Sequence, residues 1–397
     1  MNNFKHNHRR RIGIDARFYG PLGKGLGRYV QEVVDNIIRL DHQGEFEYVV
    51  FLSPENINDF KSDNPFVTKR ELSLRWYSWR EQLFFPWILR RERLDLVHFP
   101  HFNIPIFTST PFVVTIHDLI LTRFPSRRAS MLPAAFYWFK QMAYRLVIRI
   151  AVLRARAIIT VSNFTRQDII DKFGADPKKL IVTYEGVADL VKQYAGPAGV
   201  MSPEQVLTNY HINRPFLLYV GNAYPHKNLD RLMVVFSELH RRRPELSLVM
   251  VGKNDYFYQR VRAKAESLQL WQDGVENTPV VLPGYIPDVH LASLYRQALL
   301  YVFPSLYEGF GLPPLEAMAH GCPVVSSDQA SLPEIIGDAA EYFNPYDEQD
   351  MIAKIESLID DSKRRQSLVA QGLNHVKKFS WSACAEKTLA IYRQSVK

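Results

Sequence analysis

Short, continuous apolar runs recur along this chain, and longer amphipathic stretches separate them. Strands that are apolar along their whole length are typical of parallel sheets, because helices cover both faces of such sheets. The runs occupy residues 11–16, 47–52, 95–99, 111–116, 157–161 and 180–184 in the first half, and 215–220, 246–251, 279–282, 299–303, 323–326 and 340–343 in the second. The pattern predicts an α/β protein with two doubly wound, Rossmann-like domains.

The domain boundaries follow from length and from a break in this pattern. A chain of 397 residues is too long for one ordinary core. Residues 186–214 are rich in glycine and proline and carry no strand signal, so we interpret them as the interdomain connection. We expect an N-terminal domain at 1–195, a second domain at 210–378, and a helix within 379–397 that packs back on the first domain. Ligands of such folds bind at the carboxyl ends of the strands, so two facing domains would enclose a cleft.

Composition limits the setting of the protein. The chain is 47% apolar and 23% charged, as in soluble globular proteins. No run of 18 apolar residues exists, and the basic start leads directly into a strand, so we expect neither a membrane span nor a signal peptide. Two cysteines, Cys322 and Cys384, cannot form a disulfide framework. These features favour a cytoplasmic protein.

The excess positive charge lies in the first half. Residues 1–190 carry 28 Lys+Arg against 19 Asp+Glu, whereas the rest carries 21 against 22. Such asymmetry indicates an acidic partner, which could be nucleic acid, an anionic membrane or a phosphorylated ligand. Residues 75–93 and 133–156 mix aromatic with basic side chains, which suggests peripheral contact with the inner face of a membrane. The alternative is an ordinary core face with solvated arginines. No nucleic-acid recognition module is present.

Two loops that follow first strands could bind anions. Residues 20–29, GPLGKGLGRY, hold four glycines ahead of a helix expected to begin near Arg28. Free N–H groups at a helix start bind anions, although the same loop could simply be flexible. It matches neither a Walker loop nor a dinucleotide fingerprint. In the second loop, residues 220–232, Lys227 could neutralise a phosphate or be merely solvated, and Asn228 could cap the helix that follows.

His117 and Asp118 end a predicted strand, where polar side chains face a ligand. A metal site would need further ligands, and His98 and His101 lie near in sequence without a carboxylate or thiolate to complete a set. No Asp-x-Asp pair is present to hold a metal against a diphosphate. We therefore expect no metal, and a hydrogen bond from His117 to a sugar.

Two glutamates flank a loop with seven residues between them, in YEGFGLPPLEA. Glu308 follows a predicted strand, and Glu316 is expected in the first turn of a helix that ends before Gly321. Glu316 could act only by stabilising the helix dipole. The two carboxylates could be the catalytic pair of a glycosidase. However, the glycines between them suit the binding of a sugar nucleotide better. The N–H groups of the loop would donate to phosphate or sugar oxygens, and the carboxylates would accept hydrogen bonds from hydroxyls.

These motifs resemble family 4 (group 1) glycosyltransferases of GT-B fold, in forms similar to those of mannosyl- or rhamnosyltransferases. The resemblance covers nearly the whole chain and is collinear. It rests on IGIDAR, GLGRY, IHDL, VSNFTRQDI, VGN…KNLDRL, LPGYIPDVHLASLYRQA, EGFGLPPLE, GCPVV and SLPEIIGDAAEYFNP. It implies retaining, metal-independent transfer of a hexosyl group, mannose-like by preference, from a nucleoside-diphosphate sugar to a glycan or lipid-linked acceptor in surface-polysaccharide synthesis. No cofactor besides the donor substrate is implied.

The resemblance also implies roles for single residues. Glu308, Lys227 and His117 would be catalytic: Glu308 beside the donor sugar, Lys227 on the leaving diphosphate, and His117 on the sugar. The donor would also meet the amides of Gly27, Phe310, Gly311 and Leu312, the carboxylate of Glu316 at the ribose, and the backbone near Tyr285 at the base. Asn222 stands where the family often has an arginine, so Arg28, Lys24 or His226 would compensate, or the diphosphate would be held less strongly.

Two other readings stay open. The chain could be a sugar-nucleotide epimerase or phosphorylase of similar two-domain shape; transfer to an added acceptor would separate this reading, because an epimerase isomerises its sugar nucleotide with no acceptor. It could also be a sugar-nucleotide-binding protein without catalysis, which any turnover would exclude.

Overall fold

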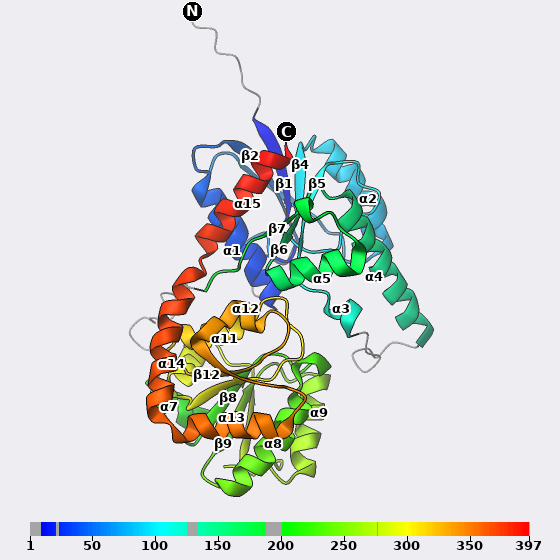
Figure 1. Ribbon diagram of the computed structural model, residues 1–397. Coiled ribbons are helices and arrows are strands. Elements are labelled where there is room, and N and C mark those ends of the chain that lie inside the picture. The colour runs from blue at the N-terminus through cyan, green and yellow to red at the C-terminus, as the bar shows by residue number, and fades with distance from the viewer. Residues whose placement is uncertain (1–8, 21–23, 125–133, 188–200, 276, 397) are drawn as a thin grey trace, which may run out of the picture. The chain divides into compact units, whose positions relative to one another are not determined.

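The computed structural model describes residues 9–20, 24–124, 134–187, 201–275 and 277–396. The chain divides into two compact units (Figure 1). The first unit comprises the chain up to Arg123, residues 132–186 and residues 380–397, and the second comprises residues 124–131 and 187–379. The C-terminal residues 380–397 thus belong to the first unit. Within the described residues, no helix is both long and apolar enough to cross a membrane.

The first unit is built on a seven-stranded sheet in which every paired strand is parallel. The strand order is β3-β2-β1-β4-β5-β6-β7. β1 and β4 are neighbours although they are not consecutive, so the chain changes direction across the sheet at this pair. The strands are β1 (Arg10–Asp15), β2 (Phe46–Leu52), β3 (Val67–Glu71), β4 (Leu96–Phe99), β5 (Phe112–Ile116), β6 (Ala157–Thr160) and β7 (Leu180–Val182).

Helices cover both faces of this sheet. α15, at the red end of the chain, packs alongside α1 on one face (Figure 1). The opposite face packs against α2 and α4, whose inward side chains share one apolar cluster with β4 and β5. The helices are α1 (Lys24–Leu40), α2 (Trp79–Arg91), α3 (Ile120–Arg123), α4 (Ala134–Arg154), α5 (Asn163–Phe173) and α15 (Trp381–Ser395), with a 3-10 turn η3 (Pro177–Lys179).

A buried polar network joins α15 and α1 to the sheet. His98 on β4 lies 2.7 Å through Nδ1 from the Tyr392 hydroxyl of α15, and 2.9 Å through Nε2 from Thr115 Oγ1 on β5. The Tyr29 hydroxyl of α1 is 3.2 Å from the same Thr115 oxygen. Burial lowers the pKa of His98 to about 3, so its imidazole is neutral near pH 7. The network satisfies each of these buried polar groups, as a core requires.

The second unit repeats the architecture with six parallel strands in the order β10-β9-β8-β11-β12-β13. β8 and β11 are the adjacent, non-consecutive pair, so this sheet also reverses its winding at its centre. The strands are β8 (Phe216–Val220), β9 (Ser247–Val251), β10 (Val280–Gly284), β11 (Leu300–Phe303), β12 (Val324–Ser327) and β13 (Ala340–Phe343).

The helices of the second unit alternate with its strands. They are α7 (Pro203–Asn209), α8 (Leu229–Arg242), α9 (Tyr256–Ser267), α10 (Asp288–Gln297), α11 (Leu312–Ala319), α12 (Leu332–Ile336), α13 (Glu348–Asp360) and α14 (Ser362–His375), with 3-10 turns η4 (Pro225–Lys227), η5 (Gly337–Ala339) and η6 (Val376–Lys378). Strand–helix alternation around two parallel sheets confirms the predicted fold class.

Some local expectations need correction. β3 was absent from the predicted strands because its sequence, VTKRE, lies at the sheet edge with three exposed residues and lacks an apolar run. α1 begins at Lys24 rather than near Arg28. The stretch interpreted as a connection, residues 186–214, includes helix α7, and its residues 188–200 lie outside the described part of the chain.

Candidate functional site

The central strands of the second sheet bring two predicted residues together. In doubly wound sheets the loops after the two strands at the reversal point diverge and leave room for a ligand. β8 leads to Asn222 and to Lys227 in η4, and β11 leads to Glu308. Both predicted charged residues therefore extend from the carboxyl ends of adjacent strands, although 81 positions separate them in the sequence.

Lys227 and Glu308 form a buried ion pair. Lys227 Nζ donates to Glu308 Oε1 over 2.5 Å, and each residue is only 8% exposed. The ammonium also lies 5.3 Å from the ring centroid of Phe303, at the end of β11, which adds a cation–π contact. Neither the lysine nor the glutamate is a solvated surface charge. Burying each charge costs desolvation free energy, which the attraction between the two charges offsets.

Backbone and hydroxyl contacts fix the loops that carry this pair. Leu306 N–H donates to the His226 carbonyl over 2.7 Å, which joins the loop after β11 to η4. The buried Ser331 hydroxyl reaches back from the start of α12 and lies 3.0 Å from the carbonyls of both Glu308 and Phe310. Ser331 was not identified from the sequence as a site residue, because a serine before Leu-Pro-Glu resembles an ordinary helix cap.

The glycine-rich segment adopts the backbone that its sequence favours. Gly311, the N-cap residue of α11, has φ +103°, and a Cβ there would lie 2.8 Å from Leu332 Cδ2. Gly311 has no side chain with which to cap this helix, and the amides of Gly311 and Leu312 stand at an N-terminus that favours anions. Phe310 is buried and packs edge-on against Phe379, with ring centroids 5.7 Å apart.

Glu316 occupies a different place from the one expected. α11 begins at Leu312, so Glu316 lies in its second turn and not in the first. Its Oε2 accepts from the Tyr295 hydroxyl of α10 over 3.4 Å, and the residue is half-buried. Gly321 follows the C-cap His320 with φ +74°, which confirms the predicted end of the helix. Tyr285, in the loop between β10 and α10, is 73% exposed.

The two asparagines near η4 serve the backbone. Asn222 Oδ1 accepts from the Tyr224 N–H over 3.3 Å, and the Asn222 carbonyl accepts from the Tyr219 hydroxyl over 2.7 Å. Asn228 precedes α8 in the left-handed region, φ 59°, and its side chain makes no cap hydrogen bond. The predicted capping role of Asn228 is therefore wrong, because its backbone is left-handed and not extended as a capping residue requires, and its side-chain amide donates to the Pro345 carbonyl.

His226 does not supply the positive charge of the arginine that the family often has at the position of Asn222. Burial, and secondly the charge of Lys227, lower the pKa of His226 to about 4. The imidazole is therefore neutral near pH 7 and adds no positive charge to this site. Among the expected compensating cations, the side chain of Lys24 lies outside the described residues, and Arg28 belongs to α1 of the first unit.

In the first unit, Gly27 marks a close approach of two backbone segments. It lies in the first turns of α1, and its carbonyl accepts from the Gly20 N–H over 3.3 Å. A Cβ at Gly27 would lie 2.1 Å from the Gly20 oxygen and 2.7 Å from the Phe18 oxygen. Only glycine allows the loop after β1 to fold so tightly onto the helix.

His117 directly follows β5, and both of its ring nitrogens face acceptors of the protein. Nδ1 lies 3.3 Å from Glu185 Oε1, and Nε2 lies 2.9 Å from the Pro100 carbonyl. Burial alone would lower the pKa of His117, but the Glu185 carboxylate and the Pro100 carbonyl outweigh it and raise that pKa. A sugar hydroxyl would have to displace one of these acceptors to accept a hydrogen bond from the imidazole.

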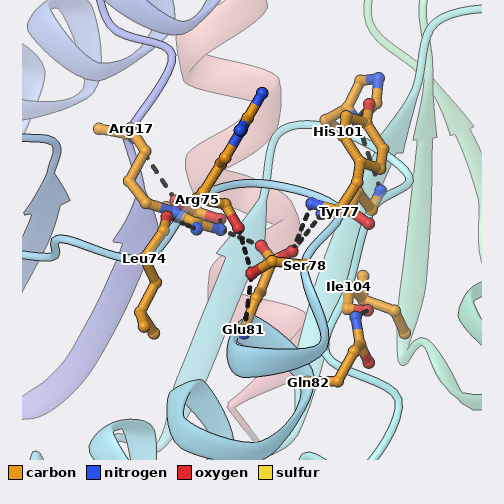
Figure 2. Close-up of polar contacts among 12 residues, drawn as sticks. Arg17, Leu74, Arg75, Tyr77, Ser78, Glu81, Gln82, His101 and Ile104 are labelled. Atoms are coloured by element: carbon orange, nitrogen blue, oxygen red, sulfur yellow. Dashed lines mark hydrogen bonds and ion pairs between the residues drawn. The ribbon is translucent and has the colours of Figure 1, made fainter.

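A buried arginine fixes the loop between β1 and α1. Arg17, the last residue of the IGIDAR motif, is 1% exposed. Its guanidinium donates to both carboxylate oxygens of Asp15 over 2.7 Å, to Glu81 Oε1 over 2.6 Å and to the Leu74 carbonyl over 3.0 Å. Figure 2 shows Arg17 between Leu74 and Glu81 at the start of α2. Sequence reasoning missed Arg17 and Glu81 because 64 positions separate these two partners in the chain.

In the part of the chain that the structure describes, no three or more His, Cys, Asp or Glu side chains gather as a metal site would require. The described residues of the second unit bring together a buried ammonium, a buried carboxylate and the N-terminus of α11. This set can bind and polarise an anionic substrate.

Comparisons with known proteins agree with this arrangement. The model of the family described as "Glycosyl transferases group 1" matches residues 209–375, and that of "Glycosyltransferase Family 4" matches residues 23–189. The O-antigen chain mannosyltransferase B of Escherichia coli is 30% identical over 388 residues, which are 93% of this chain and 96% of that protein. An O-antigen chain mannosyltransferase of Salmonella typhimurium is 26% identical over 89% of this chain and 93% of its own length.

Solved structures show the same fold. A sucrose-phosphate synthase from Thermosynechococcus elongatus superposes with a TM-score of 0.71 at 20% identity, over 97% of this chain and 99% of that chain. The glycosyltransferase WaaG, described as involved in lipopolysaccharide biosynthesis, superposes with a TM-score of 0.69 at 16% identity, over 96% and 99%. With full-length relatives and both family models in agreement, the chain belongs to the group 1, family 4 glycosyltransferases and has their GT-B fold.

Proposed function

We propose that this glycosyltransferase moves a mannosyl group from a nucleoside-diphosphate mannose to a glycan or lipid-linked acceptor, with retention, in surface-polysaccharide synthesis. The sugar and the setting are supported by relatives named as O-antigen chain mannosyltransferases, which match this chain over nearly its whole length. Further relatives, which match 58% of this chain, are named as serotype-specific mannosyltransferases.

The observation that carries the proposal is the buried Lys227–Glu308 pair at the reversal point of the second sheet. A diphosphate brought to this point would exchange its hydration for a fixed ammonium and for the amides of Gly311 and Leu312. Because these groups are already held in place, they stabilise the charge that develops on the leaving diphosphate without further reorganisation.

The remaining assignments extend the same logic along the donor. Glu308, beside Lys227, would accept hydrogen bonds from the sugar hydroxyls. It would also stabilise the positive charge that develops on the sugar ring as the bond to the diphosphate breaks. Glu316 would accept the ribose hydroxyls, and the backbone near Tyr285 would meet the base. With no separate base assigned, the departing phosphate would take the proton of the acceptor hydroxyl on the same face, which gives retention. The assignments of Gly27 and His117, in the first unit, stay predictions.

We further propose that the reaction needs no metal and no cofactor beyond the donor. Lys227 and the α11 amides supply the positive field that a metal would otherwise provide to the diphosphate. Transfer that persists in a chelator would support this proposal, and transfer restored only by added Mg²⁺ or Mn²⁺ would overturn it.

Epimerase or phosphorylase activity is not favoured, because the relatives that match nearly the whole chain are named as mannosyltransferases. A binding protein without catalysis is also not favoured, because the chain keeps a buried carboxylate next to the lysine. An assay of the sugar nucleotide with and without acceptor distinguishes these functions. A glycosyltransferase forms a glycosylated product from the sugar nucleotide only with acceptor, an epimerase isomerises the sugar nucleotide without one, a phosphorylase needs a sugar 1-phosphate as donor, and a binding protein turns over none of these.

A thermal-shift screen against GDP-, UDP-, dTDP- and ADP-sugars tests the donor. A ligand that binds only the folded state at 100 times its Kd stabilises it by about 2.7 kcal/mol. We expect one nucleotide series to raise the melting temperature, with the mannose form among its best members. No shift with any sugar nucleotide would contradict the proposed function.

A further inference from the structure

Helix α2 presents an unusual surface to solvent. It exposes seven side chains, and each is either large and apolar or an arginine: Trp79, Arg80, Leu83, Phe84, Trp87, Arg90 and Arg91. The tryptophans are 69% and 56% exposed and Leu83 is 57% exposed. The acidic residue within the helix, Glu81, is buried against Arg17. The exposed side of α2 thus carries no carboxylate.

Helix α4 repeats this composition. From residue 138 onward its exposed side chains are again apolar or basic: Trp138, Phe139, Lys140, Met142, Ala143, Arg145, Leu146, Arg149, Leu153 and Arg154. Phe139 and Met142 are 72% and 68% exposed, which is far more than a helix covered by its own domain would show. A helix that faces only water normally carries polar residues of both signs on its outer side.

The two helices lie over the same face of the sheet. Their inward residues, such as Phe85 of α2 and Ile148 of α4, share one apolar cluster on the same face of the sheet, so their outward sides both face away from it. In Figure 1 both lie along the same side of the first unit.

The loop before β5 links the two helices. Gln82 of α2 bonds to Ile104 O and Ile106 N, over 3.2 and 2.8 Å, and Arg154 of α4 donates to the Ile106 carbonyl. Phe107 in this loop is 67% exposed. We call the exposed residues of α2, Phe107 and the exposed residues of α4 the α2–α4 face.

The charge of this face indicates which kind of partner it can bind. Its seven charged side chains are all basic, and no acidic residue occurs between positions 119 and 167. A second copy docked through the same face would place positive charge opposite positive charge, which disfavours a dimer. Aromatic and aliphatic side chains interspersed with arginine and lysine fit the boundary between acidic headgroups and acyl chains.

We infer that the α2–α4 face docks the first unit on a bilayer that contains anionic phospholipid. The apolar side chains enter the boundary with the acyl chains, and the guanidinium and ammonium groups pair with headgroup phosphates. This goes beyond the proposed transfer reaction. Vesicle binding needs neither donor nor acceptor, so its failure and the failure of the proposed function are separate results.

Cosedimentation of the full chain with vesicles tests the inference. Phosphatidylcholine vesicles that contain phosphatidylglycerol are compared with pure phosphatidylcholine, at low salt and at about 0.5 M NaCl, where charges are strongly screened. We expect binding to the anionic vesicles that weakens with salt. The emission of the tryptophans should shift to the blue on binding, because Trp79, Trp87 and Trp138 lie on the face.

Two double variants separate the contribution of the basic side chains to vesicle binding from that of the apolar side chains. Each basic residue near an anionic surface strengthens binding about fivefold, so Arg145→Gln with Arg149→Gln should weaken it about 25-fold. Trp79→Gln with Phe139→Gln removes the most exposed apolar side chain of each helix, so it should weaken binding and reduce the blue shift. The matched control is Lys363→Gln with Leu373→Gln on α14, where both side chains are exposed but belong to the second unit. Circular dichroism confirms that each variant folds.

Three results would overturn the inference. The first is a wild-type chain that does not bind anionic vesicles at low salt. The second is a control variant that loses as much binding as the α2–α4 variants. The third is a concentration-dependent dimer that disappears in the Trp79→Gln, Phe139→Gln variant, which would assign the face to a second copy of the chain.

Discussion

Breaking the Lys227–Glu308 pair should cost both stability and catalysis. At a separation of 2.5 Å the Coulomb attraction is about 7 kcal/mol for an effective dielectric constant of about 20. Desolvation of two residues that are each 8% exposed offsets much of it. Removing one partner leaves the other charge buried and unpaired, which costs about 3–5 kcal/mol. We expect this loss for Lys227→Met, and a smaller one for Glu308→Gln because an amide oxygen can still accept the hydrogen bond.

A double-mutant cycle measures the coupling. The double variant should be less destabilised than the sum of the two single variants, by about 2–4 kcal/mol. The matched control is the Lys354–Glu341 pair of the same unit, at 2.9 Å but with side chains 39% and 21% exposed. Its coupling should stay below about 1 kcal/mol, because solvent screens it. The unfolding free energy of the second unit can be measured for each variant by hydrogen exchange of peptides from β8 and β11 at increasing urea concentration.

The same variants should separate stability from chemistry. In Glu308→Gln a nucleoside diphosphate can replace the lost counter-charge, so this ligand should stabilise the variant at least as much as the wild type. In Lys227→Met the ligand should stabilise the protein less. Transfer should fall about 100-fold or more in both, as expected when a preorganised electrostatic contact is lost. Near-normal turnover in either variant, or coupling no larger than in the control pair, would refute the reasoning.

Three further outcomes follow from single contacts. Ser331→Ala removes the buried hydroxyl that lies 3.0 Å from the Glu308 and Phe310 carbonyls, so it should lower the unfolding free energy by about 1–2 kcal/mol and slow transfer. Ser305→Ala, whose buried hydroxyl has no hydrogen-bond partner in the described structure, should change little by the same assays. Gly27→Ala should lower the melting temperature because its Cβ meets backbone oxygens, whereas Gly25→Ala, which has open space, should be neutral or stabilising; equal effects would contradict the close approach. For His98 the pKa in the folded protein, about 3, lies below the value of about 6.5 in the unfolded chain. The unfolding free energy should therefore be highest above pH 6.5 and should fall by about 2 kcal/mol by pH 5. In urea unfolding measured against pH, His98→Gln should lose less unfolding free energy over that range.

The strands could be predicted because buried parallel strands are continuous apolar runs, and the charged residues after them could be placed at the sheet's carboxyl edge. The Lys227–Glu308 bond could not, because it depends on β8 lying next to β11, which are not consecutive. Propensity placed Asn228 at a cap, but its left-handed backbone does not allow the capping bond. The exposure of α2 and α4 also could not be settled from sequence, since the same residues would suit a core.

The most direct test of the central claim is the anomeric configuration of the product. The enzyme is given the nucleoside-diphosphate α-mannose that stabilises it most, with a mannoside or lipid-linked acceptor, and the new linkage is assigned by NMR. The proposed function predicts an α-mannoside that forms only when acceptor is present and that Glu308→Gln forms at a small fraction of the wild-type rate. A β-linked product, or conversion of the sugar nucleotide without transfer to any acceptor, would contradict it.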